Sequence, residues 1–368
     1  MQENSKPVWC LLGKKAGDNT QVMALAKALG EDFEEKHIQA HAWELLVHLG
    51  HGATLAGIDQ GASSPLTAPW PELVISAGRR NEPVAQWIRR QSGGRTRLVH
   101  IGRPWAPLDS WDLIVTTPQY FLPRRRNILH NTLPLHDFAA EQLRTEAQEF
   151  IAAHAHLPRP WIALLVGGDS GPFVLTPDKG AMLGDLADRL AAATRGSLLV
   201  SDSPRTHWAV GDAITDQLHG DNFVYRWDAA GHNPYREILG AADAFIVTGE
   251  SMSMLAEAAA MDKPLLIFDS GDGATPWWKL RHNYRYKPLS HHLAMALGPK
   301  RMLRDVGNIQ RALYAAGRAR RLRGDRLGEA VQYALGYAPE GGRDGPANLS
   351  EVELQASADA LRRLLQAR

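Results

Sequence analysis

The chain has 368 residues, of which 44% are hydrophobic and 22% are charged, and its formal net charge is +1. This composition is typical of a globular protein, and the length indicates two domains. A net charge so close to zero argues against an overall electrostatic attraction to nucleic acid. The single cysteine, Cys10, excludes an intrachain disulfide and a cysteine-rich metal site.

No targeting or membrane-spanning segment is predicted. The first seven residues are polar, with no signal-like apolar region, and no apolar stretch is long enough to span a bilayer. We therefore expect a cytoplasmic protein. The arginine-rich run at 123–127 could still contact anionic acceptor groups or lipid headgroups.

In the first half, apolar runs alternate with helix-forming segments, which indicates an α/β domain. A helix capped by Asp18 or Asn19 is expected to run to about Leu29. Residues 50–71 are expected to form a long loop, because Gly, Ala, Ser and Pro are frequent there. The expected strands are Val8–Leu12, Ile38–Leu46, Leu73–Ser76, Arg97–Ile101 and Asp112–Thr116.

A helical segment over 138–154 leads to a proline-rich stretch at 157–160, and a second α/β run follows it. We therefore assign a first domain to 1–155, a second to 156–338, and a linker with a C-terminal helix to 339–368. The strands expected in the second domain are Trp161–Val166, Ser197–Val200, Asn222–Tyr225, Ala244–Val247 and Leu265–Phe268.

The C-terminal part is expected to be helical over Pro299–Ala316, Gly324–Leu335 and Ser350–Leu365. Ser350 and Glu353 fit a capping box, and the apolar positions of the last helix suggest that it docks on a domain. The five arginines between positions 318 and 326 favour a solvated basic face over a nucleic-acid site.

Four turns of the second half follow predicted strands or begin the next helix, so they should lie along the sheet edge at which parallel sheets bind ligands. Glycines in the first turn allow a phosphate to approach the backbone, and Arg205 can hold phosphate oxygens in a bidentate grip. Glu257 could accept hydrogen bonds from ribose hydroxyls. The predicted nucleotide-sugar site consists of Gly167, Gly168, Ser170, Ser203, Arg205, Thr206, Asn233, Tyr235, Glu250, Ser251, Ser253 and Glu257.

Several of these residues also have a purely structural interpretation. The glycines could serve only the turn, and Arg205 could pair with a structural carboxylate. Ser251 and Asn233 could cap helices, and Glu257 could be a solvated surface residue.

The first half offers candidates for binding an acceptor. A sugar transfer that inverts needs a base to deprotonate the acceptor hydroxyl, and Asp18 is the candidate, although an Asp at this place commonly caps a helix instead. The residues expected to bind the acceptor are Lys14, Asn19, Gln21, Arg79 and Arg80.

Several motifs of other function classes are missing. The chain has no G-x-x-x-x-G-K-[ST] loop, which argues against an ATPase, and no G-x-G-x-x-G follows its first strand, which argues against a dinucleotide-dependent oxidoreductase. No cluster of His, Asp and Glu residues has the spacing of metal ligands. His291 and His292 are interpreted as a pair of surface residues and not as metal ligands. We expect neither a metal nor a cofactor beyond the nucleotide-sugar substrate.

The order of these turns resembles the "elongated mitochondria" family, which is named for a plant mitochondrial-fission factor and has many bacterial members. The resemblance covers roughly Trp9 to Leu297. The motifs that carry it are Gly17-Asp18-Asn19-x-Gln21, Ala77-Gly78-Arg79-Arg80, Gly167-Gly168-x-Ser170, Ser203-x-Arg205-Thr206, Asn233-Pro234-Tyr235 and Thr248-x-x-Ser251-x-Ser253-Met254-x-x-Glu257-Ala258.

That family is similar to the GT-B glycosyltransferases, in which two Rossmann-like domains face a cleft and the C-terminal domain binds the sugar nucleotide. The resemblance implies this fold, with a C-terminal helix that crosses back to the first domain, and implies that Glu257 holds the ribose. The chain departs from many members, which have Asp at the place of Glu250 and an acidic-His pair at the place of Gln119-Tyr120.

These observations lead to one main hypothesis and two alternatives. The main one is an inverting, metal-independent glycosyltransferase that uses a nucleotide-sugar donor and a lipid-linked or cell-envelope saccharide acceptor, in the cytoplasm or at the inner face of the membrane. The first alternative is a non-catalytic GT-B-shaped scaffold that binds a partner protein, which the missing acidic-His pair favours. A sugar-nucleotide epimerase is the second.

Overall fold

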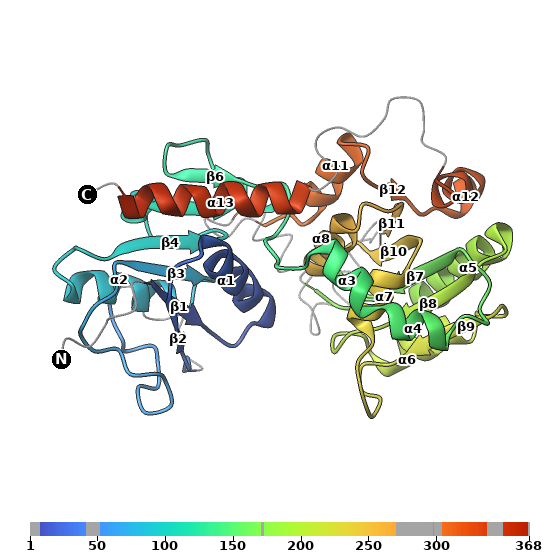
Figure 1. Cartoon of the computed structure of the whole chain (residues 1–368), viewed down its shortest axis with the longest axis horizontal. Helices are drawn as coiled ribbons and strands as arrows, with labels where there is room; N and C mark the ends of the chain where they lie inside the picture. Colours follow the sequence, from blue (N-terminus) through green and yellow to red (C-terminus); the bar gives the residue numbers. More distant parts are fainter. Residues whose placement is uncertain are drawn as a thin grey trace. The chain divides into compact units, whose positions relative to one another are not determined.

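The computed structural model describes residues 8–41, 52–170, 173–269, 297, 304–336 and 349–366. The chain divides into two compact units, each built around its own sheet (Figure 1). The first unit comprises Met1–Asp137, Pro299–Asp305 and Ser350–Arg368. The second comprises Phe138–Gly298 and Val306–Leu349.

Six parallel strands form the centre of the first unit. They are β1 (Val8–Leu12), β2 (Phe33–His37), β3 (Leu73–Ala77), β4 (Arg97–Ile101), β5 (Leu113–Thr116) and β6 (Ile128–His130). Their order in the sheet is β2-β1-β3-β4-β5-β6. The direction in which successive strands are added therefore reverses between β1 and β3. Open α/β sheets bind ligands at such a point of reversal, beyond the carboxyl ends of the strands.

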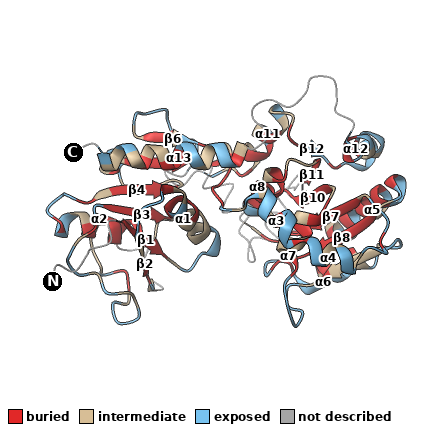
Figure 2. Ribbon diagram, in the orientation of Figure 1, coloured by how far each residue is buried: buried red, intermediate tan, exposed pale blue. Residues whose placement is uncertain are grey.

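Helices cover both faces of this sheet. They are α1 (Ala16–Leu29), α2 (Glu82–Gln91) and α13 (Leu349–Gln366), with short 3-10 turns at η2 (Leu108–Ser110) and η3 (Pro118–Tyr120). Successive side chains of a strand point to opposite faces, so Cys10 joins the core that includes α1 and α13, whereas Leu11 joins the core that includes α2. The inner strands β1, β3, β4 and β5 are buried, and the outer helix faces are exposed (Figure 2).

The C-terminal helix α13 belongs to the first unit, as predicted. Its Ala358 and Leu361 are fully buried in the same core as α1. Arg362 donates hydrogen bonds to the carbonyl oxygens of Ala28 (2.6 Å) and Leu29 (3.2 Å), at the end of α1. These are carbonyls that a helix C-terminus leaves without an intrahelical partner, and a cation is favourable there.

The second unit has the strand order of the Rossmann fold. Its strands are β7 (Trp161–Leu165), β8 (Ser197–Ser201), β9 (Asn222–Tyr225), β10 (Ala244–Thr248), β11 (Leu265–Phe268) and β12 (Arg320–Arg321). They lie in the order β12-β11-β10-β7-β8-β9, and all the pairs are parallel. The point of reversal therefore lies between β7 and β10.

The helices of the second unit pack on this sheet and on one another. They are α3 (Ala140–Glu146), α4 (Gln148–Ala153), α5 (Pro177–Thr194), α6 (Trp208–Thr215), α7 (Tyr235–Ala241), α8 (Met252–Ala260), α11 (Gly307–Ala315) and α12 (Leu327–Ala334), with a 3-10 turn η5 (Gly324–Arg326). Gly184 lets α5 approach α6 closely, because a Cβ there would lie 2.6 Å from the carbonyl oxygen of Ile214.

The sheet edges differ from the sequence prediction. The second strand is Phe33–His37 instead of Ile38–Leu46, of which residues 42–46 lie outside the described part. This edge strand is charged, and the ammonium of Lys36 lies 4.2 Å from the ring centroid of Trp9. The short edge strands β6 and β12 were not predicted either, because neither carries a sustained apolar pattern.

Several helix ends also differ. The first helix begins at Ala16, with Lys15 at the N-cap position, so neither Asp18 nor Asn19 caps it. The segment over 138–154 forms two helices that meet at Ala147. Helix α11 begins at Gly307 and not at the predicted Pro299, although residues 299–303 lie outside the described part. Just before it, the backbone N–H of Asp305 donates a hydrogen bond to the carbonyl oxygen of Gln119. The segment over 324–335 begins as η5 before it continues as α12.

The expected capping box of the last helix is also wrong. Ser350 already lies inside the helix. The carboxylate of Glu353 accepts hydrogen bonds from the backbone N–H groups of Thr132 (2.6 Å) and Leu133 (3.1 Å). A tertiary contact in the first unit therefore uses the carboxylate that the capping box would need.

Two further findings concern properties predicted from composition. Among the described helices, none is long and apolar enough to cross a membrane. Cys10 is buried in β1, and burial, with a smaller contribution from Glu35, raises the pKa of its thiol to about 12. The thiol therefore stays protonated, and Cys10 packs as a small core residue.

Candidate functional site

In the second unit, the turns after β7, β8 and β10 meet at the carboxyl edge of the sheet. They are neighbours because β7 pairs with both β8 and β10. Gly167, the second residue after β7, donates its N–H to the hydroxyl of Thr248 at the end of β10 (2.8 Å). This edge is the point of reversal at which Rossmann folds bind ligands.

The two glycines after β7 are required by close packing. Gly168 has a φ of +115°, and a Cβ on it would lie 2.3 Å from the carbonyl oxygen of Arg205. A Cβ on Gly167 would lie 2.2 Å from Oε1 of Glu250. Only glycine fits at either position, so the turn after β7 lies directly against the turns after β8 and β10.

Glu250 holds this turn from inside the protein. Its side chain has no exposed surface, and Oε1 accepts hydrogen bonds from the N–H of Gly168 (2.7 Å) and the hydroxyl of Thr248 (3.1 Å). Burial raises the pKa of this carboxyl group, against the opposing effect of Arg205 and of the hydrogen bonds. The geometry thus gives Glu250 a positioning role beneath the site.

Helix α11 supports the same turn from the other side. Gln310 donates a hydrogen bond from Nε2 to the carbonyl oxygen of Gly249 (2.8 Å), and a Cβ on Gly249 would lie 2.3 Å from that nitrogen. A residue distant in the sequence therefore fixes the backbone that carries Glu250 and Ser251.

Arg205 connects the turns and remains partly exposed. Its guanidinium donates hydrogen bonds to the carbonyl oxygen of Asp169 (3.2 Å) and the hydroxyl of Ser251 (3.1 Å). It lies 3.9 Å from Oε1 of Glu250, and 39% of its side chain is exposed. A fixed cation with a free face at this edge is suited to phosphate oxygens.

Ser203 and Thr206 support Arg205 from within the same loop. The hydroxyls of both donate hydrogen bonds to the carbonyl oxygen of Gly167, and Thr206 also bonds to that of Val166 (3.1 Å). Both residues are buried. They therefore shape the loop that presents Arg205 and do not face solvent themselves.

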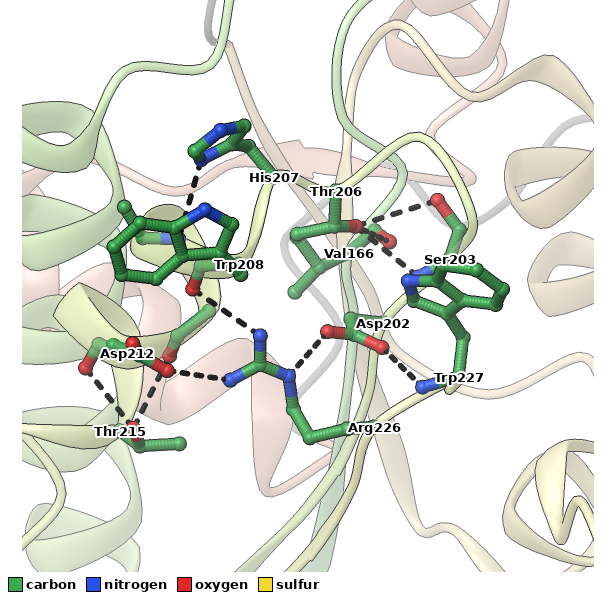
Figure 3. A network of polar contacts seen from close by, with 12 residues as sticks. Val166, Asp202, Ser203, Thr206, His207, Trp208, Asp212, Thr215, Arg226 and Trp227 are labelled. Carbon is green, nitrogen blue, oxygen red and sulfur yellow. Dashed lines mark hydrogen bonds and ion pairs between the residues drawn. The ribbon is translucent and has the colours of Figure 1, made fainter. Parts of the chain in front are cut away.

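A network around Arg226 fixes this loop to α6 and to the end of β9 (Figure 3). Its guanidinium donates hydrogen bonds to Asp202 (2.7 Å), to Asp212 (2.9 Å) and to the carbonyl oxygen of Trp208 (3.2 Å). Asp202 also accepts the N–H of Trp227 (2.7 Å). The loop from 202 to 206 is thus held at both ends, which limits the movement of Arg205.

Tyr235 and Glu257 form a second polar pair, on α7 and α8. The phenolic hydroxyl of Tyr235 donates a hydrogen bond to Oε2 of Glu257, and the N–H of Tyr235 donates to the side chain of Asn233 (3.0 Å). Burial raises the pKa of Glu257 to about 6, against smaller lowering effects of Tyr235 and Arg236. Glu257 is buried, so it is not the solvated residue of the structural alternative.

The other predicted residues lie nearer the surface. Ser253 is exposed in the first turn of α8, on the same helix face as Glu257, because residues four apart share a face. Ser170 is half-buried and pairs through its backbone with Phe173. Ser251 takes the N-cap position of α8 without a capping hydrogen bond, since its hydroxyl accepts from Arg205.

The first unit brings Asp18 to the equivalent sheet edge. Its carboxylate lies over Gly78, where a Cβ would approach Oδ2 to 2.5 Å and where φ is +71°. Asn19 is used structurally, because its side-chain amide exchanges hydrogen bonds with the N–H (2.9 Å) and carbonyl (2.8 Å) of Gly13. Lys14, Asn19 and Arg80 line a recess of only about 30 Å³ beside these turns.

A larger cavity of about 220 Å³ adjoins this recess in the first unit. Asp18, Gln21 and Arg79 line it. The other polar residues of its wall were not among the predicted acceptor-binding residues, although they lie at or just after the ends of β4, β5 and β6, where ligands of such sheets bind. They include Arg103, Thr116, Thr117, Gln119, Tyr120 and Asn131, with Arg304 from a distant part of the chain.

A family model described as "Mitochondrial fission ELM1" matches residues 16–291. The chain belongs to this family. Mitochondrial fission protein ELM1 of Arabidopsis thaliana is 26% identical over 237 residues, with coverage of 58% of this chain and 55% of the plant protein. An uncharacterized Rickettsia prowazekii protein is 25% identical over 229 residues, with coverage of 54% and 64%. The chain thus spans less than two thirds of the length of either relative.

Solved structures resemble this ELM1-family chain in fold alone. UDP-GlcNAc 2-epimerase of Methanocaldococcus jannaschii matches with a TM-score of 0.53 and 11% identity, over 98% of this chain and 99% of the epimerase. MurG of Acinetobacter baumannii matches with a TM-score of 0.45 and 11% identity, over 98% and 99%. With the two six-stranded parallel sheets, the GT-B-like fold class is confirmed.

The region that matches the ELM1-family model contains nearly all the predicted site. Lys14 alone among the predicted site residues falls outside 16–291, and so do Arg304 and helix α13. Over the described ranges, no group of three or more His, Cys, Asp or Glu side chains is placed to hold a metal ion. His291 and His292 lie outside those ranges.

Proposed function

We propose that this ELM1-family chain is an inverting, metal-independent glycosyltransferase with a nucleotide-sugar donor. The acceptor would be a lipid-linked or cell-envelope saccharide, met in the cytoplasm or at the inner face of a membrane. The observation that carries the proposal is Arg205, a partly exposed guanidinium fixed between two turns at the point of reversal of a Rossmann sheet.

The donor diphosphate would bind at Arg205 and at the glycine turn after β7. The guanidinium supplies a fixed positive charge, and the absence of side chains on Gly167 and Gly168 lets the diphosphate approach the backbone. Glu257, as a carboxylate, would accept hydrogen bonds from the ribose hydroxyls, with Tyr235 holding it in place.

The transfer would proceed by one displacement at the anomeric carbon. The acceptor hydroxyl oxygen forms the new bond while the bond between that carbon and the diphosphate oxygen breaks, and the bonding pair leaves with the diphosphate. Arg205 would stabilise the charge that develops on the leaving group. Asp18 would take the proton of the acceptor hydroxyl as general base.

The neighbours in fold suggest which donor to test first. The Methanocaldococcus jannaschii protein is named for UDP-GlcNAc, so UDP and UDP-sugars come before other nucleotides. If UDP-GlcNAc were converted to its 2-epimer with no acceptor present, the reaction would be an epimerisation and the proposed transfer would be wrong.

The test is nucleotide binding by the intact chain, measured by calorimetry with UDP, GDP and their sugars. Arg205→Gln should weaken binding by tenfold or more, since a charge-assisted contact to a phosphate is lost; this corresponds to about 1.4 kcal/mol. Arg189→Gln is the matched control, because Arg189 is a half-exposed arginine of α5 that pairs only with the adjacent-turn Asp185 in the described structure. Equal nucleotide affinities of the parent and Arg205→Gln would show that the donor does not bind at Arg205.

One observation favours a second candidate, a non-catalytic scaffold that binds a partner protein. Gln119 and Tyr120 lie in the cavity wall of the first unit, and Asp18 is the sole carboxylate among the described residues of that wall. A scaffold would agree with the mitochondrial fission role in the name of the plant relative. A folded chain that binds none of the nucleotides would favour this candidate.

A further inference from the structure

The cavity of the first unit has an excess of positive charge that the donor site does not explain. Its described wall contains the cations Lys15, Arg79, Arg103 and Arg304, against the single carboxylate of Asp18. All of these residues belong to the first unit. The described wall of this electropositive cavity is therefore built from the first unit alone.

The cations of this wall repel one another. Burial lowers the pKa of Arg103, and it lowers that of Lys15, to which Arg304, Arg79 and Arg80 add repulsion while Asp18 opposes the shift. Burial also raises the pKa of Tyr120. Cations that repel one another at close range are stabilised by an anion between them.

Two polar atoms of the wall lack a partner within the described ranges. The hydroxyl of Thr116, a residue that is 1% exposed, makes no hydrogen bond, and neither does Nε of Arg103. Both line the cavity. Buried polar groups are normally hydrogen-bonded, so two unpartnered polar atoms on residues of one cavity wall indicate a missing acceptor.

The rest of the wall is held in place. Arg103 donates a hydrogen bond from Nη1 to the carbonyl oxygen of Tyr120, and Arg304 donates from Nε to the side-chain oxygen of Gln119 (3.1 Å). Gln119 is buried and donates in turn to the hydroxyl of Thr117 (3.0 Å). The guanidinium groups are therefore preorganised, which lowers the cost of binding.

We propose that this cavity binds a phosphate or diphosphate group, with Arg103 and Thr116 as its direct ligands. A volume of about 220 Å³ holds about seven water molecules, which is enough room for a diphosphate. The tetrahedral oxygens can accept from a guanidinium and a hydroxyl at once, and a charge of minus two or more balances the excess of cations.

The position of Asp18 gives the anion a place in the proposed reaction. Asp18 lies over Gly78 at the end of β3, whereas Thr116 ends β5, two strands away. Neighbouring strands are about 4.8 Å apart, so the two ends of the cavity are separated by about 10 Å. If the glycosyltransferase proposal holds, on which this step rests, the acceptor is a phosphorylated saccharide with its phosphate at Thr116 and its reacting hydroxyl at Asp18.

The experiment is calorimetric titration of the full chain with inorganic pyrophosphate, in an Arg205→Gln background that silences the proposed donor site. We expect binding that Arg103→Gln weakens by tenfold or more and Thr116→Val weakens by at least threefold. Thr116→Val should fold, because the hydroxyl it removes has no partner in the described structure. Arg125→Gln is the control, since Arg125 is an exposed arginine of the same unit that pairs with Asp109 outside the cavity.

The outcomes separate this inference from the donor proposal. Pyrophosphate that binds equally well to the parent, Arg103→Gln and Thr116→Val, or that does not bind at millimolar concentration, overturns the phosphate site. Citrate that binds as tightly as pyrophosphate also overturns it, because the cavity would then select only charge. Pyrophosphate binding in the Arg205→Gln background, together with no UDP binding by the parent, supports the phosphate site and rejects the donor proposal.

Discussion

The hydroxyl of Tyr235 donates a hydrogen bond to Oε2 of Glu257 and so joins the start of α7 to a buried carboxylate on α8. Burial is the largest influence on this carboxyl group and raises its pKa from 4.5 to about 6. The charged form is therefore less favourable in the folded chain than in the unfolded chain. Stability and ligand binding should both depend on pH for this reason.

The pH dependence of stability follows from the sign of that shift. Because the pKa is raised on folding, the contribution of Glu257 is fully present below pH 4.5 and is lost as the pH rises to about 6. The loss is about 2 kcal/mol. Glu257→Gln cannot ionise, so the free energy of unfolding of the parent should fall relative to that of the variant between pH 4.5 and 7. Parallel pH profiles of the two proteins would contradict the shift.

Nucleotide binding should have the opposite pH dependence. In the proposed donor site a ribose hydroxyl would donate to the ionised carboxylate, so affinity for a nucleoside diphosphate should rise as the pH passes through about 6. Calorimetry on the parent and on Glu257→Gln at pH 5 and 7.5 measures the effect, and the variant should show a much smaller change. The same rise in both proteins would assign the dependence to the phosphate or to another residue.

Removal of the Tyr235 hydroxyl should raise the pH at which Glu257 ionises. The hydrogen bond from Tyr235 lowers the pKa of Glu257 against the effect of burial, so Tyr235→Phe should raise that pKa further. The variant should also lose about 1.5 to 3 kcal/mol of stability at neutral pH, and less in acid, since a bond to a charged acceptor is lost. Titration of the carboxyl carbon of Glu257 by NMR measures the pKa directly.

Tyr333→Phe provides the comparison. The hydroxyl of Tyr333 is also buried, but it donates to the carbonyl oxygen of Arg318 (3.3 Å), which does not ionise. Its removal should lower stability by a similar amount at every pH between 4.5 and 7.5. A pH-independent loss in Tyr235→Phe as well would show that the phenol is not coupled to Glu257.

The sequence predicted the strands whose interior is apolar and the turns that follow them. The runs at Leu73–Ala77 and Ala244–Thr248 are buried along their whole length, and such runs are visible without knowledge of the fold. The strand Phe33–His37 was missed because it lies at a sheet edge, where charged residues such as Lys36 are tolerated.

The turns could be located from the sequence, but the directions of their side chains could not. Arg205 and Glu250 were both predicted to contact a ligand, yet only Arg205 keeps an exposed face. Glu250 lies inward because Gly168 offers it a backbone N–H, a contact between turns that are 82 residues apart. Arg304 joins the cavity of the first unit from an even more distant segment, which no local pattern indicates.

The Gly168 position should not tolerate a side chain. With φ at +115° and the carbonyl oxygen of Arg205 only 2.3 Å from where a Cβ would lie, Gly168→Ala combines strain with overlap. We expect a loss of about 2 to 3 kcal/mol in the free energy of unfolding and a loss of nucleotide affinity, because the turn moves away from Arg205.

Gly328→Ala separates this effect from the general effect of alanine. Gly328 lies in α12, and nothing described lies within 4 Å of a Cβ placed on it. Alanine there should raise stability by up to about 1 kcal/mol, because it favours the helix. Urea denaturation of both variants measures the two changes. A Gly168→Ala variant as stable as the parent would mean that the turn relaxes without cost.

The packing of α13 on the first unit should contribute substantially to stability. Leu361 is fully buried against the core that contains α1, so Leu361→Ala should cost about 3 kcal/mol through lost contacts and a residual cavity. Val352 lies in the same helix but is 44% exposed, so Val352→Ala should change stability by less than about 0.5 kcal/mol.

Glu353→Ala tests the polar half of the same contact. It leaves the N–H groups of Thr132 and Leu133 without their carboxylate acceptor, which should cost about 1 to 3 kcal/mol. If Leu361→Ala and Glu353→Ala were both as harmless as Val352→Ala, α13 would not be docked in solution. Urea denaturation of the three variants, with hydrogen exchange of the Thr132 and Leu133 amides, decides between a docked and an undocked helix.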